Sequence, residues 1–268
     1  MIDPGKIAFW IPPELKNFKR KLFDRIGEGI RAKGGLLLYD DFRQLERIPA
    51  DKIPLVGCSP YLRPLITEWR ATGRRWAYWD RAYCRRVFAT DLPPGINGGY
   101  YRVQLDDFQM KKIKQVSDAR WRLMDTPVWD WRPEGKHIVI AEPSETYQKF
   151  HGIEGWTKRT VAEIKKYTDR PLVFRNKEMQ RSGRKLHEDL KGAHCLVTHG
   201  SNAAVEAVIM GCPVFVDETS AASLVGHTDI SKIEEPIYPD RQAWCNSLAH
   251  NQWNEAEMCN GKVWRMIE

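Results

Sequence analysis

Residues 195–216, CLVTHGSNAAVEAVIMGCPVFV, decide how the second half of the chain is expected to fold. An apolar run ends at the polar tetrapeptide HGSN (199–202), and apolar residues then recur at helical spacing. Gly211 and Pro213 end that helical pattern, and a second apolar run follows. The stretch therefore predicts a strand, a tight polar turn, a helix and a second strand, which is the repeating unit of a parallel α/β sheet.

The bend of this stretch combines features of an anion-binding site. A helix that starts directly after a strand leaves its first N–H groups unpaired, and these groups attract negative charge together with the helix dipole. Gly200 allows a ligand to approach the backbone closely, and Ser201 or Asn202 can cap the helix. Glu206 follows roughly one turn later, within reach of a ribose hydroxyl. The bend is thus suited to a nucleotide diphosphate, although its spacing fits a capped turn with an ordinary polar surface equally well.

Alternating strand and helix patterns extend over the rest of the chain. In the first half we expect strands at 6–11, 35–40, 53–58, 75–80 and 98–105, and helices at 13–34 and 61–73. In the second half we expect strands at 137–144, 171–177, 194–200 and 213–217, and helices at 155–168, 185–192 and 202–211. Residues 125–136, DTPVWDWRPEGK, have the composition of a linker. The pattern predicts an α/β protein with two doubly wound parallel sheets, in domains spanning 1–130 and 131–268.

The C-terminal residues are expected to complete the second domain as two helices. The side chains that we interpret as packing positions on these helices are Trp244, Leu248, Trp253, Met258 and Trp264. Parallel α/β sheets bind their ligands at the carboxyl ends of the strands. The residues that follow strands are therefore the first candidates for function.

Composition narrows the class of protein. The chain has 268 residues, of which 42% are hydrophobic, and a formal net charge of +7. The charge favours a polyanionic partner, and a merely solvated basic surface is an equal alternative. The sequence holds no apolar run of about 18 residues and no signal-peptide pattern at its start, so we expect a cytoplasmic protein without a membrane partner. The six cysteines form no CxxC pair and are interpreted as reduced thiols.

The stretch THGSNAAVEAVIMGCPVFV resembles the donor-site turn of GT-B glycosyltransferases, which have two facing Rossmann-like domains with a cleft between them. The resemblance covers roughly residues 136–217. In that family the turn and the helix start bind the diphosphate of a nucleotide sugar, and a Glu binds its ribose. The resemblance implies these roles for His199, Gly200, Ser201, Asn202, Ala203 and Glu206.

Two further strand ends fit a donor site. Ser144 follows the first strand of the second half, and Arg175 and Lys177 follow the next one. A capping serine and two solvated cations are the plain alternatives. Cations at this edge would neutralise a diphosphate leaving group, a task that a metal performs in other transferases. The sequence has no Asp-x-Asp motif, so we predict a metal-independent reaction with no bound cofactor and a nucleotide sugar, expected to be a UDP-sugar, as co-substrate.

The first domain is expected to hold the acceptor and the catalytic base. Asp80 ends a strand among aromatic and basic residues, and a positioned carboxylate can take the proton of an acceptor hydroxyl. A turn-capping or Arg81-paired Asp80 is the structural alternative. His199 is the rival base, and the other histidines have no comparable context. The residues expected to bind the acceptor are Trp79, Arg81, Tyr83, Arg85, Arg86, Tyr101 and Arg102.

The mixture of arginines and aromatic residues suggests an acceptor. Basic residues neutralise phosphates, and aromatic rings stack on bases that have left a duplex. The chain thus resembles the small phage-type transferases that glycosylate hydroxymethylated pyrimidines in DNA, and this implies a hexosyl- or pentosyltransferase of a bacteriophage. The alternatives are a transferase acting on a cell-envelope glycan, a nucleotide-sugar epimerase of the same fold, and a non-enzymatic nucleic-acid-binding protein.

Overall fold

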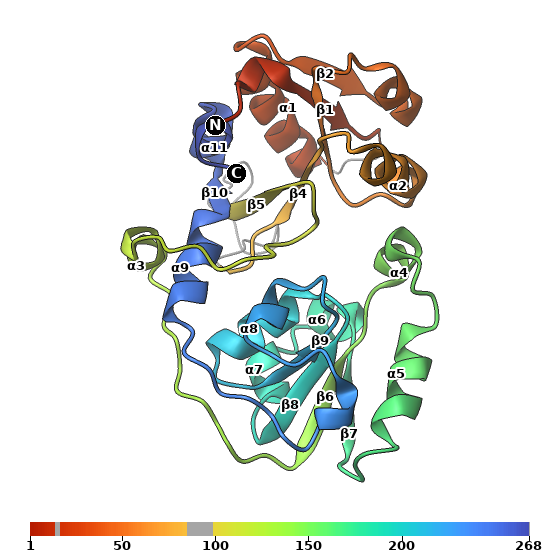
Figure 1. Ribbon diagram of the computed structural model, residues 1–268, viewed down its shortest axis with the longest axis vertical. Coiled ribbons are helices and arrows are strands. Elements are labelled where there is room, and N and C mark those ends of the chain that lie inside the picture. Colours follow the sequence, from red (N-terminus) through yellow and green to blue (C-terminus); the bar gives the residue numbers. More distant parts are fainter. Residues whose placement is uncertain (14–16, 85–98, 268) are drawn as a thin grey trace. The chain divides into compact units, whose positions relative to one another are not determined.

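The computed structural model describes residues 1–13, 17–84 and 99–267, and these form two compact units (Figure 1). Unit 1 comprises Met1–Phe108 and His250–Glu268, and unit 2 comprises Gln109–Ala249. The sequence predicted a single boundary between residues 130 and 131. The chain instead passes into unit 2 earlier and returns to unit 1 at its C-terminal end.

Unit 1 is built around a six-stranded sheet in the order β10-β5-β4-β3-β1-β2. Its strands are β1 Ile7–Ile11, β2 Leu36–Tyr39, β3 Ile53–Val56, β4 Ala77–Arg81, β5 Tyr100–Leu105 and β10 Gln252–Asn254. The strands β1 to β4 are parallel, as predicted, but β5 is antiparallel to β4 and to β10. The prediction of an entirely parallel first sheet was therefore wrong. No helical pattern separates β4 from β5 in the sequence, and parallel neighbours need a crossover connection, which is usually a helix.

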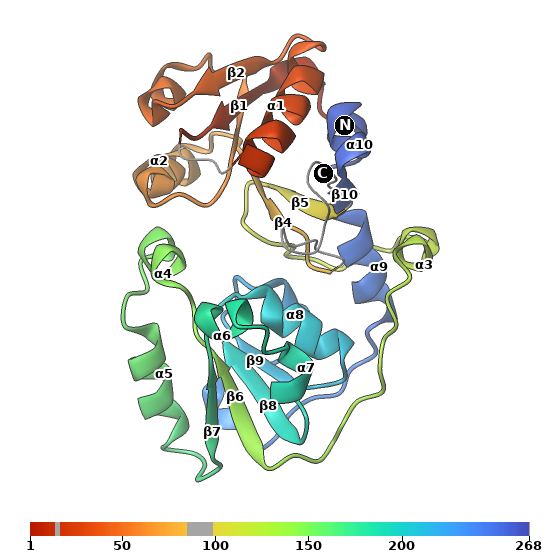
Figure 2. The same ribbon diagram turned by 180° about the vertical axis from the view of Figure 1, so that it is seen from behind.

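The helices of unit 1 are α1 Asn17–Arg31, α2 Arg63–Thr72, α10 Glu255–Cys259 and α11 Lys262–Met266. The apolar side of α1 and the two C-terminal helices pack on one face of the sheet, where Phe9, Ile26, Trp253 and Trp264 are fully buried. Figure 2 shows α10 beside α1. The predicted C-terminal packing positions are all buried, but Trp253 lies on the strand β10 rather than on a helix.

Unit 2 has a four-stranded parallel sheet in the order β7-β6-β8-β9. Its strands are β6 His137–Ala141, β7 Leu172–Arg175, β8 Ala193–Thr198 and β9 Val214–Val216. Its helices are α3 Ala119–Met124, α4 Glu145–His151, α5 Trp156–Ile164, α6 Lys177–Arg181, α7 Leu186–Asp189, α8 Asn202–Ile209 and α9 Gln242–His250. Residues 195–216 thus form the strand, turn, helix and strand that the sequence predicted.

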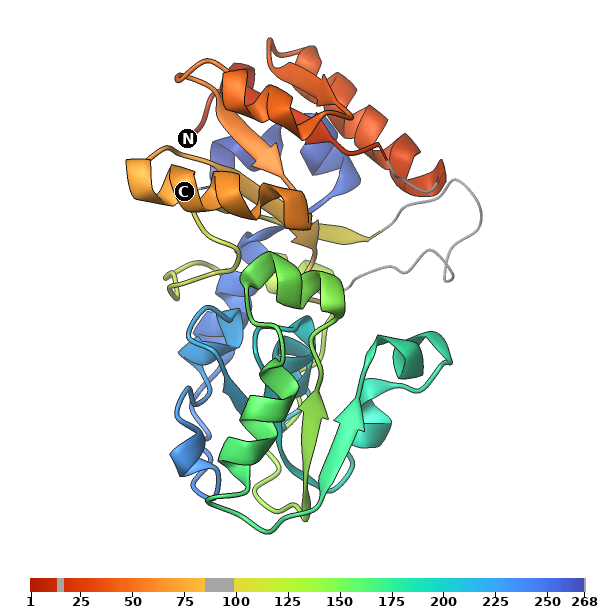
Figure 3. The same cartoon turned by 90° about the vertical axis from the view of Figure 1, so that its right-hand side faces the viewer.

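The helices of unit 2 cover both faces of its sheet. Ile164 of α5 packs with Ile138, Val197 and Phe215 on one face, and Figure 3 shows α5 lying along that face. The helices α7 and α8 contact each other and lie on the opposite face (Figure 2). This arrangement follows from right-handed crossovers, since the connection from β6 to β7 runs in the opposite direction to those from β7 to β8 and from β8 to β9.

The proline- and tryptophan-rich stretch 125–136 is packed against unit 2. The N–H of Trp129 donates to the carbonyl of Ile209 at 2.9 Å, and the N–H of Arg132 donates to the carbonyl of Gly211 at 2.8 Å. The indole of Trp131 donates to the carbonyl of Pro239 at 3.0 Å. These bonds make the stretch a border of unit 2 rather than the linker that its composition predicted.

Candidate functional site

The carboxyl ends of the parallel strands of unit 2 bring polar residues to one edge of the sheet. Ser144 follows β6 and caps α4, and its hydroxyl accepts a hydrogen bond from the N–H of Tyr147 at 3.4 Å. His199 follows β8, and Asp217 follows β9 directly. Because these strands are parallel neighbours, their polar ends meet, as the rule for α/β sheets requires.

The turn between β8 and α8 is capped and tightly packed. The Ser201 hydroxyl accepts the N–H of Ala203 at 3.2 Å, so it is the helix cap. A Cβ atom on Gly200 would lie 2.5 Å from the Tyr147 hydroxyl and 3.1 Å from Nε2 of Gln109. The buried Gln109 amide also donates to the Gly200 carbonyl at 2.7 Å. A larger residue at position 200 would therefore have to displace the Tyr147 hydroxyl.

The helix α8 carries the other residues predicted to bind the donor. Asn202 begins the helix, and Ala203 and Glu206 follow on it, all three partly exposed. Between them Ala204 and Val205 are fully buried and fix the helix against the sheet. The exposed side of α8 thus presents the predicted ribose-binding carboxylate, whose role stays a prediction.

His199 is held between two side chains. It is 8% exposed, its Nδ1 lies 3.3 Å from the Tyr147 hydroxyl, and its Nε2 lies 3.6 Å from Oδ2 of Asp217. The rings of His151 and Tyr147 contact each other with centroids 4.0 Å apart and planes tilted by 32°. Burial lowers the pKa of His199, and the Asp217 charge opposes this only in part. The imidazole is consequently neutral near pH 7.

Asp217 is the partly exposed member of this group, with 36% of its side chain accessible. Burial acts to raise the pKa of Asp217, but hydrogen bonds from the hydroxyl and N–H of Thr219, the protonated form of His199 and the charge of Lys111 lower this pKa by more. The net shift of this pKa is downward. The carboxylate is therefore ionised and faces the His199 ring.

The cations predicted to hold a diphosphate occupy different environments. Arg175 is buried, and its guanidinium donates to Asp189 at 2.5 Å and to the carbonyl of Arg184 at 2.9 Å. Arg184 forms a second ion pair with Asp189. Arg175 therefore joins β7 to α7, which favours a structural role, and its predicted part in binding the diphosphate stays a prediction. Lys177 is exposed at the start of α6, where a ligand can reach it.

Asp80 lies at the end of β4 in unit 1 and is paired with an arginine. Its Oδ2 accepts from the Arg102 guanidinium at 3.0 Å and from the Tyr78 hydroxyl at 3.3 Å. The Arg102 side chain is 5% exposed, and that of Asp80 is 39% exposed. Arg102 is thus an ion-pair partner of Asp80, and the backbone N–H of Arg81 also donates to Oδ1 of Asp80 at 2.7 Å. These contacts favour a structural Asp80, and its role as base stays a prediction.

The predicted acceptor surface is largely buried. Trp79 and Tyr83 are 5% and 0% exposed, and Trp79 packs in the core of unit 1. Tyr101 is partly buried against the same core, and Arg102 is 4% exposed. Buried rings cannot stack on a base, so Trp79 and Tyr83 do not form the predicted stacking surface. An acceptor role for Tyr101 and Arg102 stays a prediction. Of the remaining candidates Arg81 is partly exposed, and Arg85 and Arg86 lie outside the described residues.

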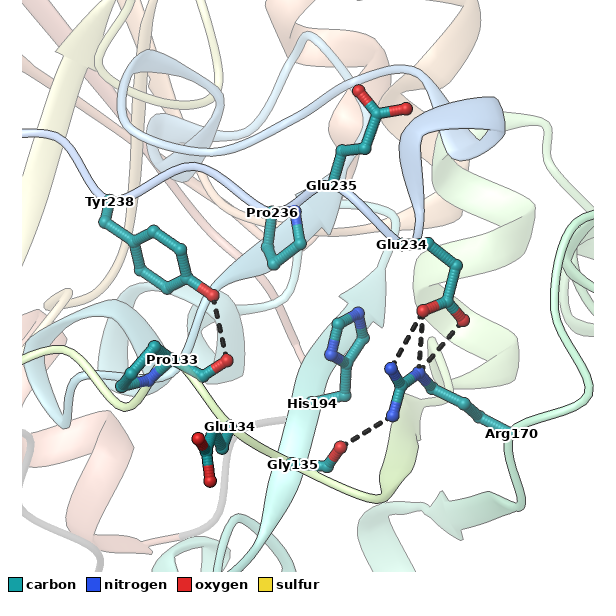
Figure 4. Close-up of a pocket in the computed structure, with 9 residues that line it drawn as sticks. All are labelled: Pro133, Glu134, Gly135, Arg170, His194, Glu234, Glu235, Pro236 and Tyr238. Carbon is teal, nitrogen blue, oxygen red and sulfur yellow. Dashed lines mark hydrogen bonds and ion pairs between the residues drawn. The ribbon is translucent and has the colours of Figure 1, made fainter.

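An open pocket of about 460 Å³ lies at the opposite, amino-terminal edge of the sheet in unit 2 (Figure 4). Arg170 forms a bidentate ion pair with Glu234 and donates to the carbonyl of Gly135 at 2.6 Å. His194 contacts the carbonyl of Ile233 at 2.7 Å. These bonds join the starts of β6, β7 and β8 to the segment that contains Ile233 and Glu234. The pocket is therefore lined by residues that connect loops to the sheet, and it lies away from the carboxyl ends of the strands, where α/β sheets bind ligands.

The described part of the chain holds neither a metal-ligand cluster nor a membrane-spanning helix. Within residues 1–13, 17–84 and 99–267, no three His, Cys, Asp or Glu side chains are grouped so that they could ligate a metal ion. In the same residues, none of the helices has the length and apolarity needed to cross a bilayer.

Comparisons with known proteins give a likeness in structure and none in sequence. No family model matches the chain, and no curated protein matches it in sequence. The chain is similar in structure to a Thermosulfurimonas dismutans protein described as KpsC, beta Kdo 2,7 transferase, with a TM-score of 0.52 and 12% identity. The match covers 96% of this chain and 98% of the other. It confirms the predicted fold class, an α/β protein with two Rossmann-like units.

Several residues of the candidate site were not found from the sequence. Asp217 directly follows a predicted strand, so the strand-end rule contained the signal that would have found it. Tyr147 and His151 lie on α4, and Gln109 precedes the sheet by many residues. Nothing in their local sequence distinguishes them, because only the packing around Gly200 brings them to the turn.

Proposed function

We propose that this protein is a glycosyltransferase that moves a sugar from a nucleotide-sugar donor to a hydroxyl acceptor. The observation that carries the proposal is the capped turn at Gly200, which leads into α8 at the carboxyl edge of a parallel sheet. Backbone N–H groups at such a turn bind phosphate, and the carboxylate of Glu206 follows on the exposed side of the same helix. The structural likeness to a sugar transferase supports this choice.

The donor residues have separate tasks in this proposal. The turn from Gly200 to Ala203 binds the diphosphate through its backbone, and Glu206 binds the ribose. Ser144 and Lys177 contribute a hydroxyl and an exposed positive charge from the two neighbouring strand ends. The charge of the phosphate leaving group is then stabilised by helix N–H groups and lysine, so we propose a metal-independent reaction of a UDP-sugar.

We favour a carbohydrate hydroxyl as the acceptor over a hydroxymethylated base in DNA. The DNA prediction depended on exposed aromatic and basic residues, and Trp79, Tyr83 and Arg102 are buried. The net charge of +7 is then the main argument left for DNA. The likeness to a protein whose description is a Kdo transferase supports a carbohydrate acceptor.

A donor panel with two classes of acceptor tests this proposal. The protein is incubated with UDP-, GDP-, ADP- and CMP-sugars, each with envelope oligosaccharides or with hydroxymethylated DNA, and the products are analysed by mass spectrometry. A glycosylated oligosaccharide supports the proposal, whereas modified DNA would restore the phage-type prediction. Conversion of the donor sugar without an acceptor would indicate an epimerase. DNA binding in gel shifts with no donor turnover would indicate a nucleic-acid-binding protein.

The metal-independent mechanism has its own test. EDTA is expected to leave the turnover of the most active donor unchanged. Loss of turnover with EDTA that returns on addition of a divalent cation would contradict this mechanism. The glycosyltransferase proposal itself would stand in that case.

A further inference from the structure

The side chains of Tyr147, His199 and Asp217 contact one another in succession beside the Gly200 turn. The Tyr147 hydroxyl lies 3.3 Å from Nδ1 of His199, and Nε2 of the same ring lies 3.6 Å from Oδ2 of Asp217. They come from three places in the chain: α4, the end of β8 and the end of β9. Both ring nitrogens of His199 thus face another ionisable group of unit 2.

The charge of Asp217 selects the tautomer of His199. A carboxylate stabilises a ring N–H that points toward it, so the proton of the neutral imidazole resides on Nε2. Nδ1 is then an acceptor, and Tyr147 donates its hydroxyl proton to it. Only 8% of His199 is exposed, so a ligand meets the Tyr147 hydroxyl before it meets the imidazole.

The Tyr147 hydroxyl lies next to Gly200, in the turn that is proposed to bind phosphate. It would be 2.5 Å from a Cβ atom built on Gly200, so it is close to the backbone of that turn. A phosphate oxygen at the turn would come within reach of this hydroxyl. It would also compete with Nδ1 of His199 for the single phenolic proton, because a hydroxyl has one proton to donate.

We propose that Tyr147, His199 and Asp217 bind the donor phosphate together with one proton, an inference that rests on the proposed function. When a phosphate oxygen arrives, the Tyr147 hydroxyl turns and donates to it. Nδ1 of His199 takes a proton from the solvent and donates in turn to the Tyr147 oxygen. The Asp217 carboxylate balances the imidazolium, so the complex gains one proton and no covalent bond changes.

The surroundings of His199 determine when it is protonated. From α4 it is faced by Tyr147 and His151, whose ring centroids lie 5.9 Å from that of His199, and Asp217 faces it from the end of β9. Lys111 donates to the carbonyl of Glu218 and acts on Asp217 with a positive charge. Burial holds the pKa of His199 below its ordinary value in the free protein. The proton therefore has to be taken up on binding.

This coupling has a defined dependence on pH. Protonation favours the complex, so nucleotide affinity is highest at low pH and falls as pH rises through the pKa of His199 in the complex. For a single coupled proton the affinity changes by at most about tenfold per pH unit.

Calorimetry in two buffers of different ionisation enthalpy counts the protons directly. UDP, GDP, ADP and CMP are titrated into the full chain near pH 7.5, and the best ligand is used for the variants. We expect net proton uptake approaching one per nucleotide. We expect His199→Asn to abolish the uptake and Tyr147→Phe to weaken binding by about tenfold, the value of one hydrogen bond to a charged group.

Matched variants separate this histidine from its neighbours. His187→Asn changes an exposed histidine on α7 and is expected to keep both uptake and affinity. Asp217→Asn is expected to reduce the uptake, and it provides a second test if His199→Asn does not fold. Nucleotide binding without proton uptake, or uptake that survives in His199→Asn, would overturn this inference and leave the proposed function standing. Failure of every nucleotide to bind the wild type would overturn the proposed function itself.

Discussion

The substitution Gly200→Ala tests the packing of the candidate site most sharply. The new methyl group would lie 2.5 Å from the Tyr147 hydroxyl, closer than carbon and oxygen normally approach, and 3.1 Å from Nε2 of Gln109. The next atom of the tyrosine, its Cζ, lies at 3.7 Å, which is ordinary van der Waals contact. The hydroxyl is therefore the main obstacle, and overpacking of this kind costs about 1–3 kcal/mol.

A double-mutant cycle with Tyr147→Phe isolates this contact. Phenylalanine removes the hydroxyl and keeps the ring, so Gly200→Ala should cost at least about 1 kcal/mol less in the Tyr147→Phe variant than in the wild type. Urea unfolding followed by hydrogen-exchange mass spectrometry reports the stability of unit 2 separately from that of unit 1. Gly183→Ala is the control, because a Cβ at that exposed glycine meets no atom within 4 Å and adds only the strain of its positive φ.

The same variants also predict a change in binding. In Gly200→Ala the displaced hydroxyl can no longer reach both His199 and a phosphate, so nucleotide affinity should fall by about tenfold. The result that would refute the reasoning is additivity, in which Gly200→Ala costs the same with and without the tyrosine hydroxyl. Tyr147 would then not contact the turn.

The contacts of individual residues lead to three further predictions. Arg175→Met leaves the buried carboxylate of Asp189 incompletely paired, so it should lower the free energy of unfolding of unit 2 by about 3 kcal/mol. Lys177→Met should keep this free energy within about 0.5 kcal/mol of the wild-type value and weaken nucleotide binding. Equal stability of the two variants would contradict this prediction. Asp80→Asn should destabilise unit 1 by about 1–3 kcal/mol because Arg102 loses its counter-ion, while a stable variant with a roughly hundredfold lower turnover would show that Asp80 is the base after all. Burial lowers the pKa of His199 in the folded protein, so below about pH 6.5 the unfolded chain binds more protons than the folded one. In urea titrations the wild type should therefore lose stability relative to His199→Asn as the pH falls from 7 to 5. Stability that depends on pH in the same way in both proteins would refute the burial of a neutral ring.

The sequence predicts the unit that carries the candidate site well, because its local signals agree with one another. In residues 195–216 the apolar run, the polar turn, the helical spacing and the closing Gly211 all point to the same strand-turn-helix-strand unit, and the structure has it. The predicted cap at Ser201 is also present. Each of these features is decided within about 20 residues of chain, so sequence patterns can report them.

Features that depend on distant partners could not be predicted. The strand β10 completes the sheet of unit 1 by pairing with β5, far earlier in the chain, and its three residues carry no strand pattern of their own. Arg175 looked like a ligand-binding cation because nothing in the sequence shows that Asp189 would pair with it. Trp79 and Tyr83 likewise suggested a stacking surface, because the sequence does not show whether an aromatic side chain is buried in a core or exposed on a surface.

The central claim is that the turn at Gly200 and the helix α8 bind a nucleotide sugar, and calorimetric titration of a Glu206 variant tests it most directly. Wild type, Glu206→Ala and Glu163→Ala are titrated with the UDP-, GDP-, ADP- and CMP-sugars. Glu163 is a partly exposed helical glutamate of the same unit, on α5, and serves as the matched control. We predict that one class of donor binds, that Glu206→Ala raises its Kd by about tenfold or more, or about 1.4 kcal/mol, and that Glu163→Ala leaves it unchanged. Donor binding that is equally strong in all three proteins would contradict the claim.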